Sequence, residues 1–412
     1  MQFLRITGML IGILSASAGF ASSASGPVER VLYSFTGGAD GEYPDSDLMI
    51  DSSGNLYGTA VTGGDFDSGA VFELTPNGSG WTETVLYSFT GGKDGGEPYG
   101  GVTLDADGNL YGTAVVGGST RGVCVENGCG VAFKLTNSGG VWSQSVIHTF
   151  TGGHDGSGPG AGLTLDKQGN LYGMTPTGGA YGLGVIYELT PGASGGWAEK
   201  IIHAFTGGDD GGTGSAGRLL LNAAGNLYGV ATVGGAYGSG TAFELAPLPN
   251  GAWRLNTLYA FKGQPDAGFP YGALTVDASG DLYGTSYYDG ANDLGAVYEL
   301  SHNGTAWSEK VLYSFQGGTD GSSPISNLVL RAGSLYGTTS EGGAAGCSCG
   351  TVFSLTPGAG ATWSESVLYS FKGAPDGAFV YNGMLAGPTG SLYGTTVHGG
   401  VDDEGSVFKF EP

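Results

Sequence analysis

The sequence predicts an all-β fold, a seven-bladed β-propeller of four-stranded blades. A single phrase of strands and turns recurs seven times in the 412 residues, each copy reads as four short strands, and the first copy is preceded by a spare outer strand. Six intervals separate Phe35 from Phe371, so the mean period is 56 residues, near the roughly 50 of kelch-type repeats. Repeated four-stranded units are what a propeller requires.

The second repeat shows the elements in chain order. Its four strands are expected at 102–105, 110–113, 131–135 and 146–150. The turn between the first two carries Gly108, where a positive φ is needed. A Gly-Gly loop precedes the third strand, and Trp142 precedes the fourth. Short strands at this regular spacing indicate an all-β protein.

Four positions recur in all seven copies of the repeat. The fourth-strand phenylalanines are Phe35, Phe89, Phe150, Phe205, Phe261, Phe315 and Phe371. The tyrosines of the Leu-Tyr-Gly element are Tyr57, Tyr111, Tyr172, Tyr228, Tyr283, Tyr336 and Tyr393. The third-strand aromatics are Phe72, Phe133, Tyr187, Phe243, Tyr298, Phe353 and Phe408. The loop aspartates are Asp40, Asp94, Asp155, Asp210, Asp266, Asp320 and Asp376.

The ends of the repeat array favour a closed ring over an open solenoid. Residues 31–35 read as a lone fourth strand, and residues 407–410 read as a third strand with no fourth strand after it. Pairing these two segments would complete the last blade and remove exposed sheet edges. A solenoid would need capping repeats, and the sequence shows none.

Glycine and tryptophan fit the same repeat. Glycine, at 85 residues, fills the turns and the Leu-Tyr-Gly position, so its abundance reflects turn chemistry and close strand packing. The six tryptophans each precede a fourth strand and are expected to pack between blades.

The N-terminus is expected to be a signal peptide. Arg5 precedes an apolar run at 6–14 and then small residues, with cleavage expected between 18 and 25. We therefore expect an exported protein (secreted, periplasmic or at the cell surface) whose residues 26–412 form one propeller domain. No later segment is apolar and long enough to span a bilayer.

The four cysteines fit an oxidising compartment. Cys124 and Cys129 are predicted to form a disulfide, and Cys347 and Cys349 are candidates for a second one. A zinc site would require both pairs to converge, although they lie more than 200 residues apart. The formal charge of −23 disfavours nucleic acid and anionic membranes as partners.

The repeat phrases resemble the bacterial GloVer tandem-repeat family of exported proteins. The matching residues include 108–113, Gly117, Gly118 and 131–135. The resemblance covers the chain after the signal peptide and implies fold and export, but no settled activity. Members that carry a C-terminal anchoring tail differ from this chain, which is expected to lack one. The strand-turn-strand phrase is also similar to NHL-type propeller repeats.

One face of the predicted ring carries the longer and more varied loops, where binding residues usually lie. The candidate ligand-binding residues on these loops are Asp65, Phe66, Asp67, Arg121, Tyr181, Tyr237, Tyr287, Tyr288 and Asp289. The weak catalytic candidates are His154, His398, Asp402 and Asp403. His148 and His203 occupy a position that is tyrosine in the other repeats, which indicates a structural role.

The seven loop aspartates permit two interpretations. A ring of carboxylates around a central funnel could bind Ca²⁺, since hard cations take oxygen ligands. Alternatively, each aspartate stabilises its own turn, which a feature repeated in every blade favours. No cofactor is predicted otherwise.

Three hypotheses for function follow. The first is a monomeric binding or scaffold module for an extracellular glycan or protein, because tyrosines and aspartates gather on one face. The second is a polysaccharide lyase or glycosidase, although no pair of carboxylates stands out. The third is a passive structural element of the cell surface.

Overall fold

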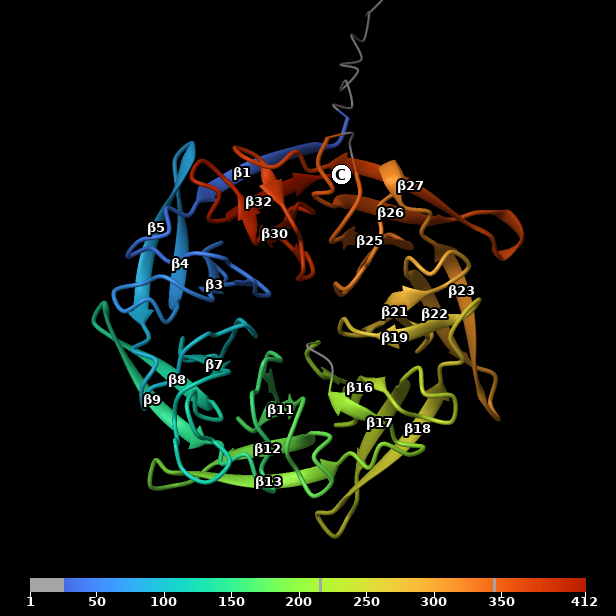
Figure 1. The fold of residues 1–412 in the computed structure, drawn as a ribbon. Coiled ribbons are helices and arrows are strands. Elements are labelled where there is room, and N and C mark those ends of the chain that lie inside the picture. The colour runs from blue at the N-terminus through green and yellow to red at the C-terminus, as the bar shows by residue number, and fades with distance from the viewer. Residues whose placement is uncertain (1–25, 215–216, 344–345) are drawn as a thin grey trace, which may run out of the picture.

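The computed structural model describes residues 26–214, 217–343 and 346–412, so the predicted signal peptide at 1–25 lies outside the described residues. Seven sheets of four or five strands surround a central axis (Figure 1). This arrangement confirms the predicted all-β, seven-bladed propeller. The helical content of the described residues is two 3₁₀ turns, Gly318–Asp320 and Ala359–Ala361.

Within blades 1–6 the strands run in chain order from the axis outwards, and blade 7 takes its outermost strand from the other end of the chain. Blade 1 contains β2 (Met49–Ile50), β3 (Leu56–Ala60), β4 (Ala70–Asn77) and β5 (Gly80–Ser88). Blade 2 contains β6 (Val102–Leu104), β7 (Leu110–Ala114), β8 (Val131–Ser138) and β9 (Val141–Thr149). Blade 3 contains β10 (Thr164–Leu165), β11 (Leu171–Thr175), β12 (Val185–Pro191) and β13 (Trp197–Ala204). Blade 4 contains β15 (Leu220–Leu221), β16 (Leu227–Val233), β17 (Thr241–Pro247) and β18 (Trp253–Ala260).

The remaining blades repeat this order. Blade 5 contains β20 (Thr275–Val276), β21 (Leu282–Asp289), β22 (Ala296–His302) and β23 (Trp307–Ser314). Blade 6 contains β24 (Val329–Arg331), β25 (Ser334–Thr339), β26 (Thr351–Pro357) and β27 (Trp363–Ser370). Blade 7 contains β29 (Leu385–Ala386), β30 (Leu392–Thr396), β32 (Ser406–Glu411) and β1 (Val28–Ser34). Short additional strands are β14 (Gly212–Gly214), β19 (Ala267–Pro270), β28 (Gly377–Ala378) and β31 (His398–Gly399).

Blade 7 combines strands from the two ends of the described chain (Figure 1). Its outermost strand, β1, pairs antiparallel with β32, from Val28 opposite Glu411 to Ser34 opposite Ser406. The ladder of this blade therefore has the same four-stranded order as the ladders of the other blades.

The observed strands differ from the expected ones in length. In blade 2 the fourth strand begins at Val141 rather than at residue 146, because Trp142 belongs to the ladder and pairs with Asn137. Exposed and partly buried residues alternate from Val141 onwards, but residues 143–145 are all polar, and this polar stretch concealed the start of the strand. The innermost strands are shorter than expected, two or three residues, in every blade.

A β-bulge recurs between the third and fourth strands of all seven blades. In blade 1, Val71 lies opposite Tyr87 and Phe72 lies opposite Val85, so Leu86 has no partner in the ladder. The equivalent shift occurs in the other six blades. A bulge strengthens the local twist of the strand. Leu86 is buried, in the core that blade 1 shares with blade 2.

The apolar core lies between neighbouring blades. Phe89 of blade 1 and Phe133 of blade 2 belong to one buried cluster, and their ring centroids are 5.0 Å apart. Tryptophans also pack across the boundary, as Trp197 of blade 3 does against Tyr111 of blade 2 at 5.8 Å. Each blade is therefore held chiefly by its neighbours.

The glycine of the Leu-Tyr-Gly element is required by close packing within the blade. A Cβ atom on Gly112 would lie 2.6 Å from Cζ of Phe133. We expect Gly112→Ala to lower the free energy of unfolding by about 1–3 kcal/mol, because the buried ring has no free space to move into. Gly196→Ala is the control, since nothing lies within 4 Å of the added atom. Denaturant unfolding of both variants would measure the difference, and equal stabilities would contradict the packing argument.

Candidate functional site

A cavity of about 620 Å³ lies where the loops of the blades meet at the centre of the ring. Its volume falls within the roughly 300–1,000 Å³ typical of small-molecule sites. One set of lining residues stands ten positions after the fourth-strand phenylalanine: Asp45, Tyr99, Gly160, Tyr271, Ile325 and Tyr381. A second set stands four positions after the Leu-Tyr-Gly tyrosine: Val115, Pro176, Thr232, Tyr287 and Ser340. The repeat therefore brings one variable position of each loop to the same cavity.

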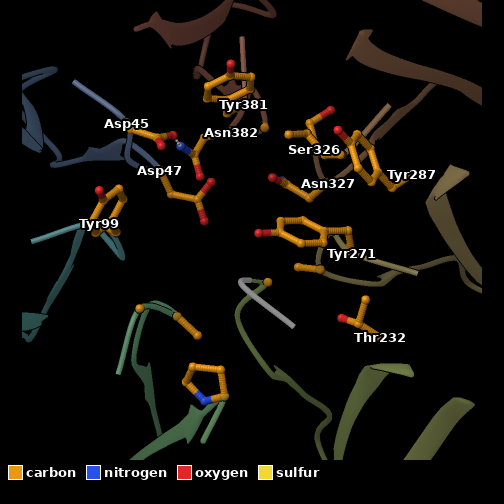
Figure 2. A pocket seen from close by; sticks show the side chains of 18 of the residues that line it. Asp45, Asp47, Tyr99, Thr232, Tyr271, Tyr287, Ser326, Asn327, Tyr381 and Asn382 are labelled. Atoms are coloured by element: carbon orange, nitrogen blue, oxygen red, sulfur yellow. Dashed lines mark hydrogen bonds between the residues drawn. The ribbon is translucent and has the colours of Figure 1, made fainter. Parts of the chain in front are cut away.

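Tyrosines and oxygen-bearing side chains dominate the wall of the cavity (Figure 2). Figure 2 shows Asp47, Asn327 and the hydroxyl of Tyr271 pointing toward one another across the central space. Tyr381 is 38% exposed and Tyr99 is also 38% exposed, so both offer ring surface to a ligand. Such a wall combines flat apolar faces with hydrogen-bonding groups at their edges.

Asp45 is a strongly perturbed acid of the cavity. Burial raises the pKa of its carboxyl group to about 7, and the neighbouring charge of Asp47 adds to this shift. The side-chain amide of Asn382 donates a hydrogen bond to Asp45 Oδ1 and opposes the shift. In turn, burial and the charge of Asp45 raise the pKa of Tyr271 and of Tyr381. Asp45 is therefore a group that exchanges a proton near neutral pH, inside the cavity.

A buried cation, Arg218, lies near these acids and acts on the charge of Asp47. Arg218 occupies the position that is Asp47, Gly101, Gly162, Ala273, Asn327 and Gly383 in the other blades, one residue before the apolar position that Leu219 fills in blade 4. Its Nη1 donates a hydrogen bond of 2.6 Å to Thr103 Oγ1 of blade 2, so the side chain reaches past blade 3. A Cβ on Gly162 would lie 2.9 Å from Arg218 Nε, which shows how closely the guanidinium lies over that loop.

The charge of Arg218 also acts on Asp47 of blade 1. Burial raises the pKa of Asp47, while the charge of Arg218 and a backbone hydrogen bond from Gly383 act in the opposite direction. Asp47 and Asn327 line both the central cavity and a smaller hollow of about 250 Å³, which Arg218 also lines. The two spaces therefore adjoin at Asp47 and Asn327.

The loop residues predicted to bind ligand lie mostly outside this cavity. Tyr287 is the one of the nine that lines it. Its ring is 4.2 Å from that of Tyr288, and a hydrogen bond with Tyr288 together with burial raises the pKa of Tyr287 to about 12. Tyr181 and Tyr237 are 63% and 60% exposed at the outer rim. Arg121, Asp67 and Asp289 also lie away from the cavity lining, and Asp65 and Phe66 line a separate outer hollow with Asp40 and Glu83.

The histidine and aspartate candidates for catalysis are also absent from the lining of the central cavity. His154 and Asp402 are exposed. His398 lies in a rim cluster, with its ring 5.1 Å from Tyr43. Asp403 Oδ1 accepts a hydrogen bond of 2.8 Å from the amide of Gly399, within its own loop.

The seven loop aspartates lie beside the outermost strands and do not meet at the centre. Asp40, for example, accepts hydrogen bonds from the Tyr33 hydroxyl and the Thr36 amide, both at 2.9 Å. The same pattern of tyrosine or histidine and backbone amide surrounds Asp94, Asp210, Asp320 and Asp376. Asp266 is 4.0 Å from Lys262 Nζ. This geometry supplies each aspartate with partners from its own turn.

Two further features concern cysteines and metals. The structure pairs Cys124 with Cys129 and Cys347 with Cys349, with Cα atoms 5.1 and 5.2 Å apart. Among the described residues, one group combines histidine and carboxylate atoms closely enough to hold a metal ion: His148, Asp155 and Glu199.

The sequence did contain evidence for the central site, but a comparison based on loop length did not reveal it. Reading down each repeat position, rather than along each loop, shows Asp47, Arg218 and Asn327 at a position that is glycine or alanine in the other blades. It also shows tyrosine, aspartate, glycine and isoleucine at the position of Tyr271. The available evidence was the set of residues that differ between repeats while their neighbours stay the same. The rim loops were predicted as the site instead, because they are longer.

Comparison with solved structures shows the fold alone. A candidate 6-phosphogluconolactonase from Bacteroides uniformis is 13% identical, with a TM-score of 0.53 over 82% of this chain and 88% of that one. A candidate oxidoreductase (glucose dehydrogenase) from Thermus thermophilus is 14% identical, with a TM-score of 0.47 over 94% and 100% of the two chains. A protein of unknown function from Dyadobacter fermentans is 12% identical, with a TM-score of 0.45 over 94% and 99%.

The family comparison is more specific. No curated protein matches the sequence. No helix within the described part of the chain has the length and apolar character needed to cross a bilayer. The model of the Gloeobacter/Verrucomicrobia repeat matches residues 20–125, 117–347 and 248–412. These overlapping matches confirm the resemblance seen in the repeat phrases, and the chain belongs to the Gloeobacter/Verrucomicrobia repeat family.

Proposed function

We propose that this protein is an exported binding module that takes the neutral end of an extracellular glycan in its central cavity. The observation that carries the proposal is the convergence of Tyr99, Tyr271, Tyr287 and Tyr381 with Asp45 and Asn327 on one cavity. Tyrosine rings offer flat apolar surface for the C–H face of a sugar. Carboxylate and amide oxygens accept hydrogen bonds from its hydroxyl groups.

The charges of the cavity narrow the class of glycan. Asp45, Asp47 and Glu341 line it, and Arg218 lines the adjoining hollow and acts on the charge of Asp47. Carboxylates in a site of low dielectric repel anions strongly. We therefore expect neutral or amino sugars to bind better than uronic acids or sugar phosphates.

Binding should depend on the central tyrosines and not on those of the rim. Tyr271→Ala or Tyr381→Ala is expected to weaken binding by roughly 30-fold, the effect of losing about 2 kcal/mol at an aromatic contact. The matched control is Tyr181→Ala with Tyr237→Ala, which removes two exposed rim tyrosines. A glycan array would find the ligand, and calorimetry would measure its affinity for each variant. Loss of binding in the rim variant alone, or no glycan bound by the wild type, would refute the proposal.

A carbohydrate-active enzyme is the second candidate, and Asp45 is the observation that favours it. A carboxyl group whose pKa is raised to about 7 is suited to general acid–base work. Incubating the bound glycan with the protein and measuring new chain ends separates the two functions. Turnover that is lost in Asp45→Asn would favour the enzyme, whereas binding without turnover favours the module.

A further inference from the structure

A three-residue cluster recurs at the boundary between neighbouring blades. It consists of an aromatic residue on an outermost strand, the loop aspartate that follows it, and a glutamate on the outermost strand of the next blade. At the boundary between blades 7 and 1 these residues are Tyr33, Asp40 and Glu83, and the Tyr33 hydroxyl donates to Asp40 at 2.9 Å. At the boundary between blades 2 and 3 the aromatic residue is His148, with Asp155 and Glu199.

Histidine changes what this cluster can bind. His148 Nε2 lies 3.5 Å from Asp155 Oδ2 and 3.8 Å from Glu199 Oε1, and the three ligand atoms lie within 4.8 Å of one another. His148 Nε2 and Glu199 Oε1 are both buried from solvent and have no hydrogen-bond partner. Tetrahedral zinc, with bonds of about 2.0–2.2 Å, places its ligand atoms roughly 3.3–3.5 Å apart. A small inward movement of Glu199 would therefore complete three zinc ligands.

The surroundings hold the aspartate ligand in place. Asp155 Oδ2 accepts a hydrogen bond of 2.8 Å from the Thr151 amide, and Asp155 Oδ1 accepts one of 2.5 Å from the Thr151 hydroxyl. The disulfide of Cys124 and Cys129 lies against Gly152 of the same loop, since a Cβ there would be 2.6 Å from Cys129 Sγ. Partners of this kind orient metal ligands in known sites.

The charges of the cluster are those that a dication balances. Burial and the charge of Asp155 raise the pKa of Glu199 to about 7, and burial lowers the pKa of His148. Two carboxylates and one neutral imidazole together offset the two charges of Zn²⁺, and an imidazole ligand favours zinc over Ca²⁺ or Mg²⁺.

We propose that His148, Asp155 and Glu199 bind one Zn²⁺ ion, with water in the fourth position, and that the ion clamps blade 2 to blade 3. The ligands come from β9, from the loop after it and from β13, so the ion would join two separate sheets. The other boundary histidine, His203, makes a 2.9 Å contact with Asp210. Leu255 stands at the position of the third ligand there, so that cluster has two donors.

The test is zinc titration of the full chain after treatment with a chelator, followed by calorimetry and thermal unfolding. The wild type should bind one equivalent of Zn²⁺ and unfold at a higher temperature with it, because binding to the native state stabilises that state. Ca²⁺ at the same concentration should have neither effect.

His148→Tyr is the decisive variant, because five other blades carry tyrosine there and the chain should fold normally. It should lose the zinc equivalent and the thermal shift, with an unchanged circular dichroism spectrum. His203→Tyr is the matched control and should retain both. The proposal fails if the wild type binds no zinc, if His148→Tyr binds it as well as the wild type does, or if His203→Tyr is the variant that loses it.

Discussion

Replacing Arg218 by leucine should lower the free energy of unfolding by roughly 1–3 kcal/mol. The substitution leaves the carboxylate of Asp47 in the channel without the cation that offsets its burial. It also removes the donor to Thr103 Oγ1. An uncompensated charge in a site of low dielectric costs more than the added apolar contact returns.

The second substitution that tests this account is Asp47→Gly, because Gly101, Gly162 and Gly383 occupy the same position in other blades. The double variant Arg218→Leu with Asp47→Gly removes both charges, and it should be more stable than Arg218→Leu alone. Arg331→Leu is the control for loss of an exposed arginine and should change stability by less than about 0.5 kcal/mol. Urea unfolding of the wild type, the two single variants and the double variant gives the coupling energy between Arg218 and Asp47. An Arg218→Leu variant as stable as the wild type would show that Asp47 needs no cation.

Stability should fall as the pH rises from about 5 to 8, the opposite of proteins that are held by ionised carboxylates. Burial and the charge of a neighbouring aspartate raise the pKa values of Glu83, Glu309 and Glu365 to about 7, from an ordinary 4.5. Burial likewise raises that of Glu29 to about 7, and Asp376 adds to the shift. Between pH 4.5 and 7 the folded chain therefore binds more protons than the unfolded chain. The stabilisation is complete below pH 4.5, the ordinary pKa of glutamate. It is lost as the pH rises through about 7, the pKa of these glutamates in the folded chain.

Blade 2 contains a natural neutral analogue of these glutamates. Gln144 occupies the position of Glu83, and its amide donates a hydrogen bond of 3.0 Å to the Asp94 carbonyl. We therefore expect Glu83→Gln or Glu365→Gln to raise the melting temperature at pH 8 and to leave it nearly unchanged at pH 5. Glu126→Gln, at an exposed loop residue, should have little effect at either pH. Melting curves at the two pH values measure these shifts. A wild type whose stability rises toward pH 8 would show that the boundary acids ionise in the folded state.

The propeller could be predicted because each copy of the repeat supplies the same evidence. Leu110, Tyr111 and Gly112 mark a strand in one blade, and six further copies of that triplet remove the ambiguity of a short apolar segment. The bulge at Leu86 was beyond prediction, since it depends on register between two strands and not on residue type.

The candidate site was harder to predict for a geometric reason. Tyr181 and Tyr271 look alike in sequence, yet one lies exposed on the rim and the other lines the central cavity. How far a loop residue lies from the axis is set by the bend of the chain between strands four and one. The position of a residue within the repeat indicates that distance, whereas the length of its loop does not. The exception was Tyr287, which belongs to both a varied loop and a lining position.

The placement of the lining residues separates two demands that most binding proteins must satisfy with the same side chains. Asp45, Tyr99, Tyr271, Ile325 and Tyr381 share one repeat position, and they lie outside the buried clusters that join the blades. Exchanging one of them changes the part of the cavity wall that a single blade contributes, and it leaves the boundary between blades intact. The ring can therefore acquire a new ligand through successive single substitutions, each neutral for folding, and this property makes it a practical scaffold for directed evolution of sugar-binding specificity.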